Sequence, residues 1–213
     1  MKGILFKPWK IKAIAESSPD REWQTRRLTG LKEINEHPDE WILKALFSNG
    51  QYWFQHPSCE RDRYLYNDYP KPNYQVGEVV YIKETLFRHP YLDEAGYVLD
   101  KIPVFINQTI GDCLKWRWPK DILSAMFMPQ EAARDFIKIT GVRAERVQDI
   151  TPSDVTNEGL GWDENTLSIP NDSQMEQDLI RQYALLWDSI NPKYPFKSNP
   201  WDWVYSFVRF DYV

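Results

Sequence analysis

Val79-Val80-Tyr81-Ile82-Lys83-Glu84 is the segment that indicates the fold class most clearly. It is rich in β-branched and aromatic residues and follows a turn at Val76-Gly77-Glu78, so we predict a strand. Two other runs have the same character: residues 136 to 147, with a bend near Gly141, and residues 201 to 213. Each run has an apolar face to bury, so we expect all three to be strands of one curved sheet or barrel.

Helices and shorter strands are expected around these runs. We predict four helices, at residues 8 to 16, 37 to 47, 151 to 159 and 173 to 190. The evidence is either apolar residues spaced three and four apart or proline, hydroxyl and acidic residues at the start of the segment. Short strands are predicted at residues 2 to 6, at 51 to 55 and within 86 to 118. Because strands and helices do not alternate regularly, the pattern favours a mixed α+β fold, a small barrel or mixed sheet with peripheral helices.

The composition limits the kinds of partner and setting. The net charge is −5, which argues against a general polyanion binder, although residues 1 to 34 carry eight basic and four acidic side chains. Cys59 and Cys113 lack the spacing of a zinc site, so we expect no metal and no cofactor, while a disulfide stays open. There is no signal-peptide pattern and no apolar run of transmembrane length, so we expect a soluble, cytoplasmic chain with no membrane partner.

A candidate site lies near the start of the chain at Gln24-Thr25-Arg26-Arg27, after the basic segment Lys10-Ile11-Lys12. Two adjacent guanidiniums offer rigid forks of donors to phosphates or base edges, and the threonine adds a hydroxyl. The same residues also suit a solvated basic turn, and Arg27 alone suits a structural ion pair with a carboxylate. The motif therefore suggests a pocket for an anion or a nucleobase, with both alternatives open.

Four pairs of segments occur in order along the chain. They are Ile4-Leu5-Phe6 with Gln24-Thr25-Arg26-Arg27; residues 74 to 79 with Lys83-Glu84-Thr85; residues 142 to 151 with Asn157-Glu158-Gly159; and residues 187 to 191 with residues 199 to 204. Together they resemble the ASCH-domain proteins of the PUA-like superfamily, in the form found in many phages and prophages. The resemblance implies one domain over residues 1 to 213, built as a PUA-like β-barrel with peripheral helices. Residues 31 to 70 and 86 to 125 match poorly and are interpreted as insertions.

The resemblance also implies a cleft, where helices meet the barrel, that binds RNA or recognises a nucleobase. One small bacterial member of the family hydrolyses the amide of N-acetylated cytidine with a Lys, a Thr and a Glu. Its Thr falls on Thr25, in a pattern whose Arg falls on Arg27, and its Glu falls on Glu158. The Lys position is occupied by Glu22, which cannot stabilise an oxyanion.

Three functions follow as expectations. We favour binding of RNA or of a modified nucleotide, because one of the three catalytic groups is missing while the pocket residues persist. The binding residues are expected to be Trp23, Thr25, Arg26, Arg27, Lys10 and Lys12. The alternatives are an amidohydrolase acting on an acylated nucleoside such as N-acetylcytidine, with Thr25 and Glu158 as catalytic residues, and a phage accessory or structural protein. The sequence leaves open the choice between RNA, DNA and free nucleoside, and the oligomeric state.

Overall fold

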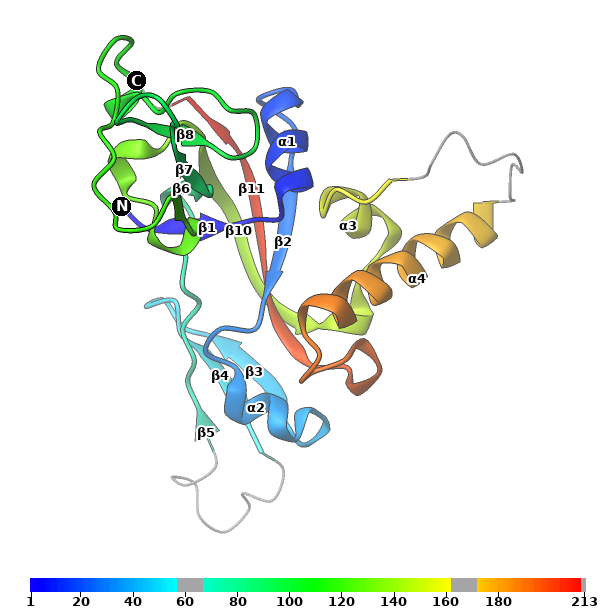
Figure 1. Cartoon of the computed structure of the whole chain (residues 1–213). Coiled ribbons are helices and arrows are strands. Elements are labelled where there is room, and N and C mark those ends of the chain that lie inside the picture. Colours follow the sequence, from blue (N-terminus) through cyan, green and yellow to red (C-terminus); the bar gives the residue numbers. More distant parts are fainter. Residues whose placement is uncertain (57–66, 162–171, 212–213) are drawn as a thin grey trace. The chain divides into compact units, whose positions relative to one another are not determined.

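The computed structural model describes residues 1–56, 67–161 and 172–211. The chain divides into two compact units, each assembled from separate stretches. The first unit comprises Met1–Arg21, Gly77–Ile139 and Phe207–Val213. The second comprises Glu22–Val76 and Thr140–Ser206. Two long strands, β10 (Phe136–Arg146) and β11 (Trp201–Phe210), contribute residues to both units (Figure 1).

The first unit is built on a sheet in which β1 (Gly3–Leu5) runs parallel to β6 (Val79–Lys83). β10 pairs with the other edge of β6 in the antiparallel direction, with Phe136 opposite Tyr81. Helix α1 (Pro8–Glu16) follows β1 and begins at a proline, which suits the first position of a helix because its N–H is not needed there. A second sheet has the order β8–β7–β9, formed by Ala95–Tyr97, Leu86–Arg88 and Ile122–Leu123.

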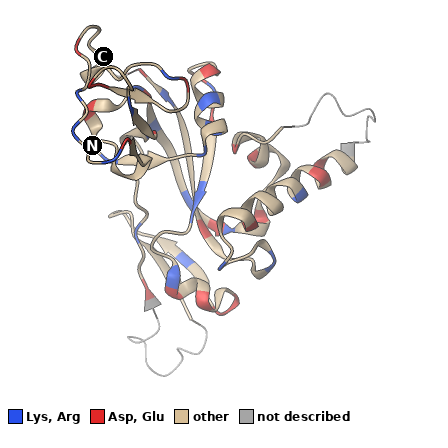
Figure 2. Cartoon of the chain, in the orientation of Figure 1, with Lys and Arg blue, Asp and Glu red and all other residues tan. Residues whose placement is uncertain are grey.

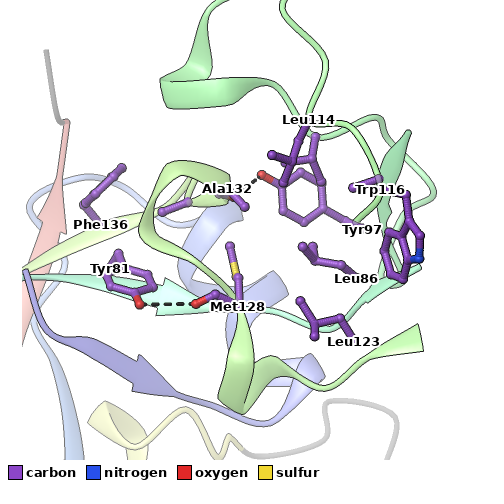
Figure 3. Close-up of a cluster of buried hydrophobic side chains, with 12 residues drawn as sticks. Tyr81, Leu86, Tyr97, Leu114, Trp116, Leu123, Met128, Ala132 and Phe136 are labelled. Carbon is purple, nitrogen blue, oxygen red and sulfur yellow. Dashed lines mark hydrogen bonds between the residues drawn. The ribbon is translucent and has the colours of Figure 1, made fainter. Parts of the chain in front are cut away.

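A cluster of buried aromatic and aliphatic side chains forms the core of the first unit (Figure 3). Two tyrosines at the core satisfy their hydroxyl groups on backbone carbonyls. Tyr81 donates to Met128 O at 3.3 Å, and Tyr97 donates to Ala132 O at 2.6 Å (Figure 3). Buried polar groups are stable only when hydrogen-bonded in this way. Gly96 of β8 leaves room for the Phe87 ring on the paired strand, because a Cβ there would lie 2.4 Å from that ring and would displace it.

In the second unit the strand order is β10–β11–β2, with β2 formed by Trp23–Arg27. A small sheet has the order β3–β4–β5, formed by Ile42–Leu46, Tyr52–Gln55 and Asn67–Asp68. Alternate residues of β4, Tyr52 and Phe54, are buried against Trp203 and Trp201 in edge-to-face contacts with centroids 4.8 and 5.0 Å apart. Aromatic pairs of this geometry hold the small sheet onto β11.

The second unit also contains the α-helices α2 (Lys32–Glu36), α3 (Pro152–Asn157) and α4 (Asp172–Ile190). α3 begins with a capping box, in which Thr151 Oγ1 accepts from the Asp154 N–H at 3.1 Å and Asp154 accepts from the Thr151 N–H. It ends at Asn157, with Glu158 as the C-cap residue, followed by Gly159 at a φ of 93° that favours glycine. α3 and α4 pack through a cluster that includes Val155, Tyr183 and Trp187. Short 3-10 helices of the described residues lie at Pro38–Glu40, Ile106–Gln108, Ala125–Phe127, Gln130–Ala132, Val147–Asp149 and Phe196–Ser198.

The mixed α+β class is confirmed, and β6, β10 and β11 are strands of one sheet as expected. The predicted helix at residues 37 to 47 is wrong. Pro38 starts only one 3-10 turn, and Ile42–Leu46 forms β3, because pairing with β4 gives this apolar run a partner. Each of the two stretches interpreted as insertions contains a three-stranded sheet of its own. The sheets of the described residues form no closed barrel, so the barrel stays a prediction.

Two further expectations concern cysteines and membranes. Cys113 carries a free thiol, and Cys59 lies outside the described residues. Within residues 1–56, 67–161 and 172–211, no helix has the length and apolar character needed to cross a bilayer.

Candidate functional site

The motif of residues 24 to 27 lies on β2 in the second unit. Successive side chains of a strand point to opposite faces, so Thr25 and Arg27 share one face and Gln24 and Arg26 share the other. Thr25 and Arg26 are buried, and Arg27 is partly buried. The strand therefore places its two adjacent guanidiniums in two different environments.

Acidic and basic residues occur on elements of both units (Figure 2).

Arg26 is the centre of a buried ionic network. Its side chain is 1% exposed, and Nη1 donates to both carboxylate oxygens of Asp202 at 3.2 and 3.3 Å. Nη2 donates to Glu145, and Asp154 lies 4.0 Å away. Burial alone would lower the pKa of the Arg26 guanidinium, but Asp202 and Glu145 raise it above its usual value. We expected Arg26 to face a ligand, and the structure places it among these carboxylates instead.

The network continues to α3 through Arg143, which donates to Glu145 at 2.6 Å and to Asp154 at 3.1 Å. Asp154 also belongs to the capping box of α3, so the network joins β2, β10, β11 and the start of that helix. Burial raises the pKa of Asp202 to about 7, although Arg26 acts to lower it. The arrangement fixes the position of α3 relative to β2 inside the second unit.

Arg27 has different neighbours. Glu158, Tyr74, Tyr205 and Tyr183 all interact electrostatically with its guanidinium. Burial lowers the pKa of Arg27, and Glu158 opposes this effect without cancelling it. Glu158 is only 8% exposed, which differs from the solvated position typical of a glutamate at a helix end. The Arg27 guanidinium and the Glu158 carboxylate are thus two buried charges that interact with each other. Burying an ion pair costs more desolvation free energy than placing it at the surface, so this position is unusual for a pair with a structural role alone.

Tyr183 of α4 is a neighbour common to the two arginines. It interacts electrostatically with both Arg26 and Arg27. Burial raises the pKa of its hydroxyl well above the usual value, and Glu158 and Asp202 add to the shift. The hydroxyl is therefore a neutral hydrogen-bonding group at physiological pH.

The other predicted site residues are placed less favourably or in the other unit. Trp23 is 1% exposed, so its ring offers no open face for stacking. Lys10 and Lys12 belong to α1 in the first unit. Lys10 is buried with its ammonium 5.4 Å from the centre of the Phe6 ring, and Lys12 is exposed. Glu22, at the position of the family lysine, is exposed.

Three residues of this region were not predicted from the sequence: Asp202, Glu145 and Tyr183. Asp202 carried a signal, because a carboxylate between Trp201 and Trp203 in a strand must find a cation when the strand is buried. Among the described residues, no group of three or more histidine, cysteine or carboxylate side chains is arranged to hold a metal ion.

Compared with known proteins, the chain matches no family model, no curated protein and no solved structure. The function is therefore inferred from the geometry of the chain and from the sequence resemblance described above.

Proposed function

We propose that this chain is a PUA-like protein of the ASCH type that binds RNA or a modified nucleotide through Thr25, Arg27 and Glu158, called here the Arg27 cluster. The observation that carries the proposal is the partly buried guanidinium of Arg27 close to the buried carboxylate of Glu158. The proposed scaffold is one PUA-like domain over the whole chain, and an RNA or nucleotide partner implies a cytoplasmic setting in a bacterial or phage-infected cell.

The chemistry of the Arg27 cluster suits a base edge. Guanidinium supplies only donors, and an ionised carboxylate supplies only acceptors. A base edge presents donors and acceptors side by side, so the two residues together match it better than either does alone. The Thr25 hydroxyl can donate or accept, which adapts the cluster to a modified base.

Energetics favour a ligand at the same place. Burial destabilises the charge on Arg27 by more than Glu158 restores, as the lowered pKa shows. A phosphate or a carbonyl oxygen of a ligand would add stabilisation to this charge. Tyr74 and Tyr205, both in electrostatic contact with Arg27, pack edge to face with centroids 5.3 Å apart. Both rings are buried, so they help to enclose Arg27 and offer no open face for stacking.

The test is binding of short single-stranded RNA and of a panel of modified nucleosides, measured by fluorescence anisotropy and by calorimetry. Arg27→Ala should weaken binding about tenfold or more, as expected for a lost hydrogen bond from a charged group. Arg181→Ala removes an exposed arginine from α4 in the same unit and should leave affinity unchanged. Glu158→Gln should change which nucleoside is preferred, because it replaces one acceptor by a donor.

A salt series separates the two possible contacts of Arg27. If the guanidinium binds phosphate, Arg27→Ala reduces the dependence of affinity on salt by about one counterion. If it binds a base edge, that dependence stays and the preference among bases changes. A folded Arg27→Ala variant that binds every probe as tightly as the natural chain contradicts the proposal.

The amidohydrolase alternative stays open to a direct assay. Thr25 and Glu158 are both buried in the second unit, but position 22 holds an exposed glutamate in place of the family lysine. Turnover of N-acetylated cytidine should therefore be slow or absent. Robust turnover that disappears in both Thr25→Ala and Glu158→Gln would favour the enzyme over the binding module.

A further inference from the structure

The first unit contains two adjoining hollows beside α1. One has a volume of about 390 Å³ and is lined by residues that include Ile11, Leu99, Asp100, Arg134 and Asp135. The other has a volume of about 330 Å³ and is lined by largely apolar residues that include Phe6, Ile11, Val98 and Leu99. Ile11 and Leu99 line both hollows, so the charged and the apolar space share a wall. Both volumes lie within the range typical of small-molecule sites.

Arg134 organises the charged hollow. Its Nε and Nη2 each donate to the Glu84 carboxylate at 2.7 Å, and Nη1 donates to Asp100 at 2.5 Å. The guanidinium also lies over the Tyr97 ring, 3.8 Å from its centre. Glu84 is 2% exposed, so this bidentate pair compensates a buried charge. The donors of Arg134 are therefore committed to Glu84 and Asp100.

The negative charge of Asp135 is only weakly compensated by nearby positive charge. Its side chain is 19% exposed, and among the described residues the one ion-pair contact within 4.0 Å is to Arg134 Nε at 3.8 Å. That nitrogen already donates to Glu84. Arg209 interacts electrostatically with Asp135, but its charge is shared with Asp211, which lies 3.7 Å from Arg209 Nη2. Two guanidiniums, Arg134 and Arg209, thus serve four carboxylates: Glu84, Asp100, Asp135 and Asp211. Burial raises the pKa of Asp135.

The remaining charges of this hollow do not alter the balance. Lys12 and Glu16 of α1 lie 3.8 Å apart and are both about two-thirds exposed, so they largely cancel each other. Lys83, on the wall of the apolar hollow, donates to Met126 O at 2.8 Å. Negative charge therefore exceeds positive charge where the charged hollow meets Asp100 and Asp135.

We propose that the two hollows form a binding site for a small organic cation with an apolar body. The ammonium or guanidinium group of the ligand lies beside Asp135 and Asp100, and its hydrocarbon chain extends past Ile11 and Leu99 toward Phe6. The carboxylates supply charge complementarity, and the shared apolar wall supplies the burial of the chain. This site is separate from the Arg27 cluster and does not depend on the function proposed for it.

The test uses three probes of equal length: hexylamine, hexanol and hexanoate. Binding to the natural chain, residues 1 to 213, is followed by chemical-shift changes of backbone amides at residues 11, 99 and 135. Hexylamine should bind about tenfold more tightly than hexanol, as expected for a charged hydrogen bond, and hexanoate should bind most weakly. Hexanol binding as tightly as hexylamine overturns the proposal, as does the absence of hexylamine shifts at these residues.

Two variants test whether Asp135 is the carboxylate that binds the ammonium group. Asp135→Asn should reduce the advantage of hexylamine over hexanol to less than about twofold without changing hexanol affinity. Asp121→Asn removes an exposed carboxylate of the same unit outside both hollows and should change neither affinity. An unchanged preference for hexylamine in Asp135→Asn contradicts the role of that carboxylate. The probe series in the natural chain keeps the proposal testable even where a variant folds poorly.

Discussion

Replacing Asp202 with asparagine should flatten the dependence of the protein's stability on pH. The carboxyl group is fully buried and shares Arg26 with Glu145, while Glu158 and Tyr183 also lie within electrostatic range. Its pKa rises from 3.8 to about 7, with burial as the largest cause. Between these two values the folded chain holds a proton that the unfolded chain has lost. The natural protein should therefore lose stability as pH rises from about 4 to 7, and no further above that.

The magnitude follows from the size of the shift. A difference of about three pKa units corresponds to about 4 kcal/mol, at about 1.4 kcal/mol for each unit. Arg26 remains charged throughout and stabilises the ionised form of Asp202, which opposes the effect of burial. We therefore expect a measured change of about 2 to 4 kcal/mol in the free energy of unfolding. The asparagine side chain does not titrate in this range, so the Asp202→Asn variant lacks this contribution. Other carboxylates with shifted pKa values, such as Glu84 and Asp154, are common to both proteins and cancel in the difference.

The assay is urea unfolding of the natural chain and of Asp202→Asn at intervals from pH 4 to pH 8. The stability of the natural chain relative to the variant should fall steadily up to about pH 7 and then stay constant. Asp149→Asn removes an exposed carboxylate of the same unit and should give a curve parallel to that of the natural chain. If the natural chain instead gains stability over the variant as pH rises, the ion pair with Arg26 dominates over burial, and the reasoning is refuted.

Two further predictions concern stability, and both are measured by urea unfolding. Arg134→Met should cost about 3 to 5 kcal/mol, because it leaves the Glu84 carboxylate buried without a partner, and adding Glu84→Gln should recover most of the loss. A double variant no more stable than Arg134→Met would contradict that explanation. Thr151→Ala should cost about 1 kcal/mol through loss of the α3 cap, and Thr151→Ser should retain most of the stability. Equal losses in the two Thr151 variants would show that the cap is not the cause.

Local patterns predicted most of the regular structure. Runs such as residues 79 to 84 are so rich in β-branched and aromatic side chains that few other structures suit them. The α3 start was predicted because Thr151 and Pro152 satisfy the needs of a helix terminus within a few residues. β3 was missed because the pattern around Pro38 imitates a helix start, and the run that follows becomes a strand only through its pairing with β4.

In the candidate site, too, features that depend on neighbouring residues were predicted, and features that depend on residues distant in the sequence were not. Thr25 and Glu158 were predicted together as catalytic residues, and Thr25 and Arg27 together as binding residues; all three belong to the second unit. The different environment of Arg26 was not predictable, since its partner Asp202 is 176 residues away in the sequence. Strand alternation indicates that adjacent arginines face opposite ways, but only the fold determines which face meets the carboxylates.

The discontinuous make-up of the two units has a consequence for synthesis in the cell. Residues 201–206 of β11 belong to the second unit and residues 207–210 to the first, so both units need the strand that a ribosome releases last among those described. Until then, apolar strands such as β6 emerge without their full set of neighbours. Chains in this condition are prone to aggregate, so yield should respond to lower temperature or to added chaperones more than for a chain whose units are continuous. For the same reason, no single truncation point can yield either unit as a separate folded fragment.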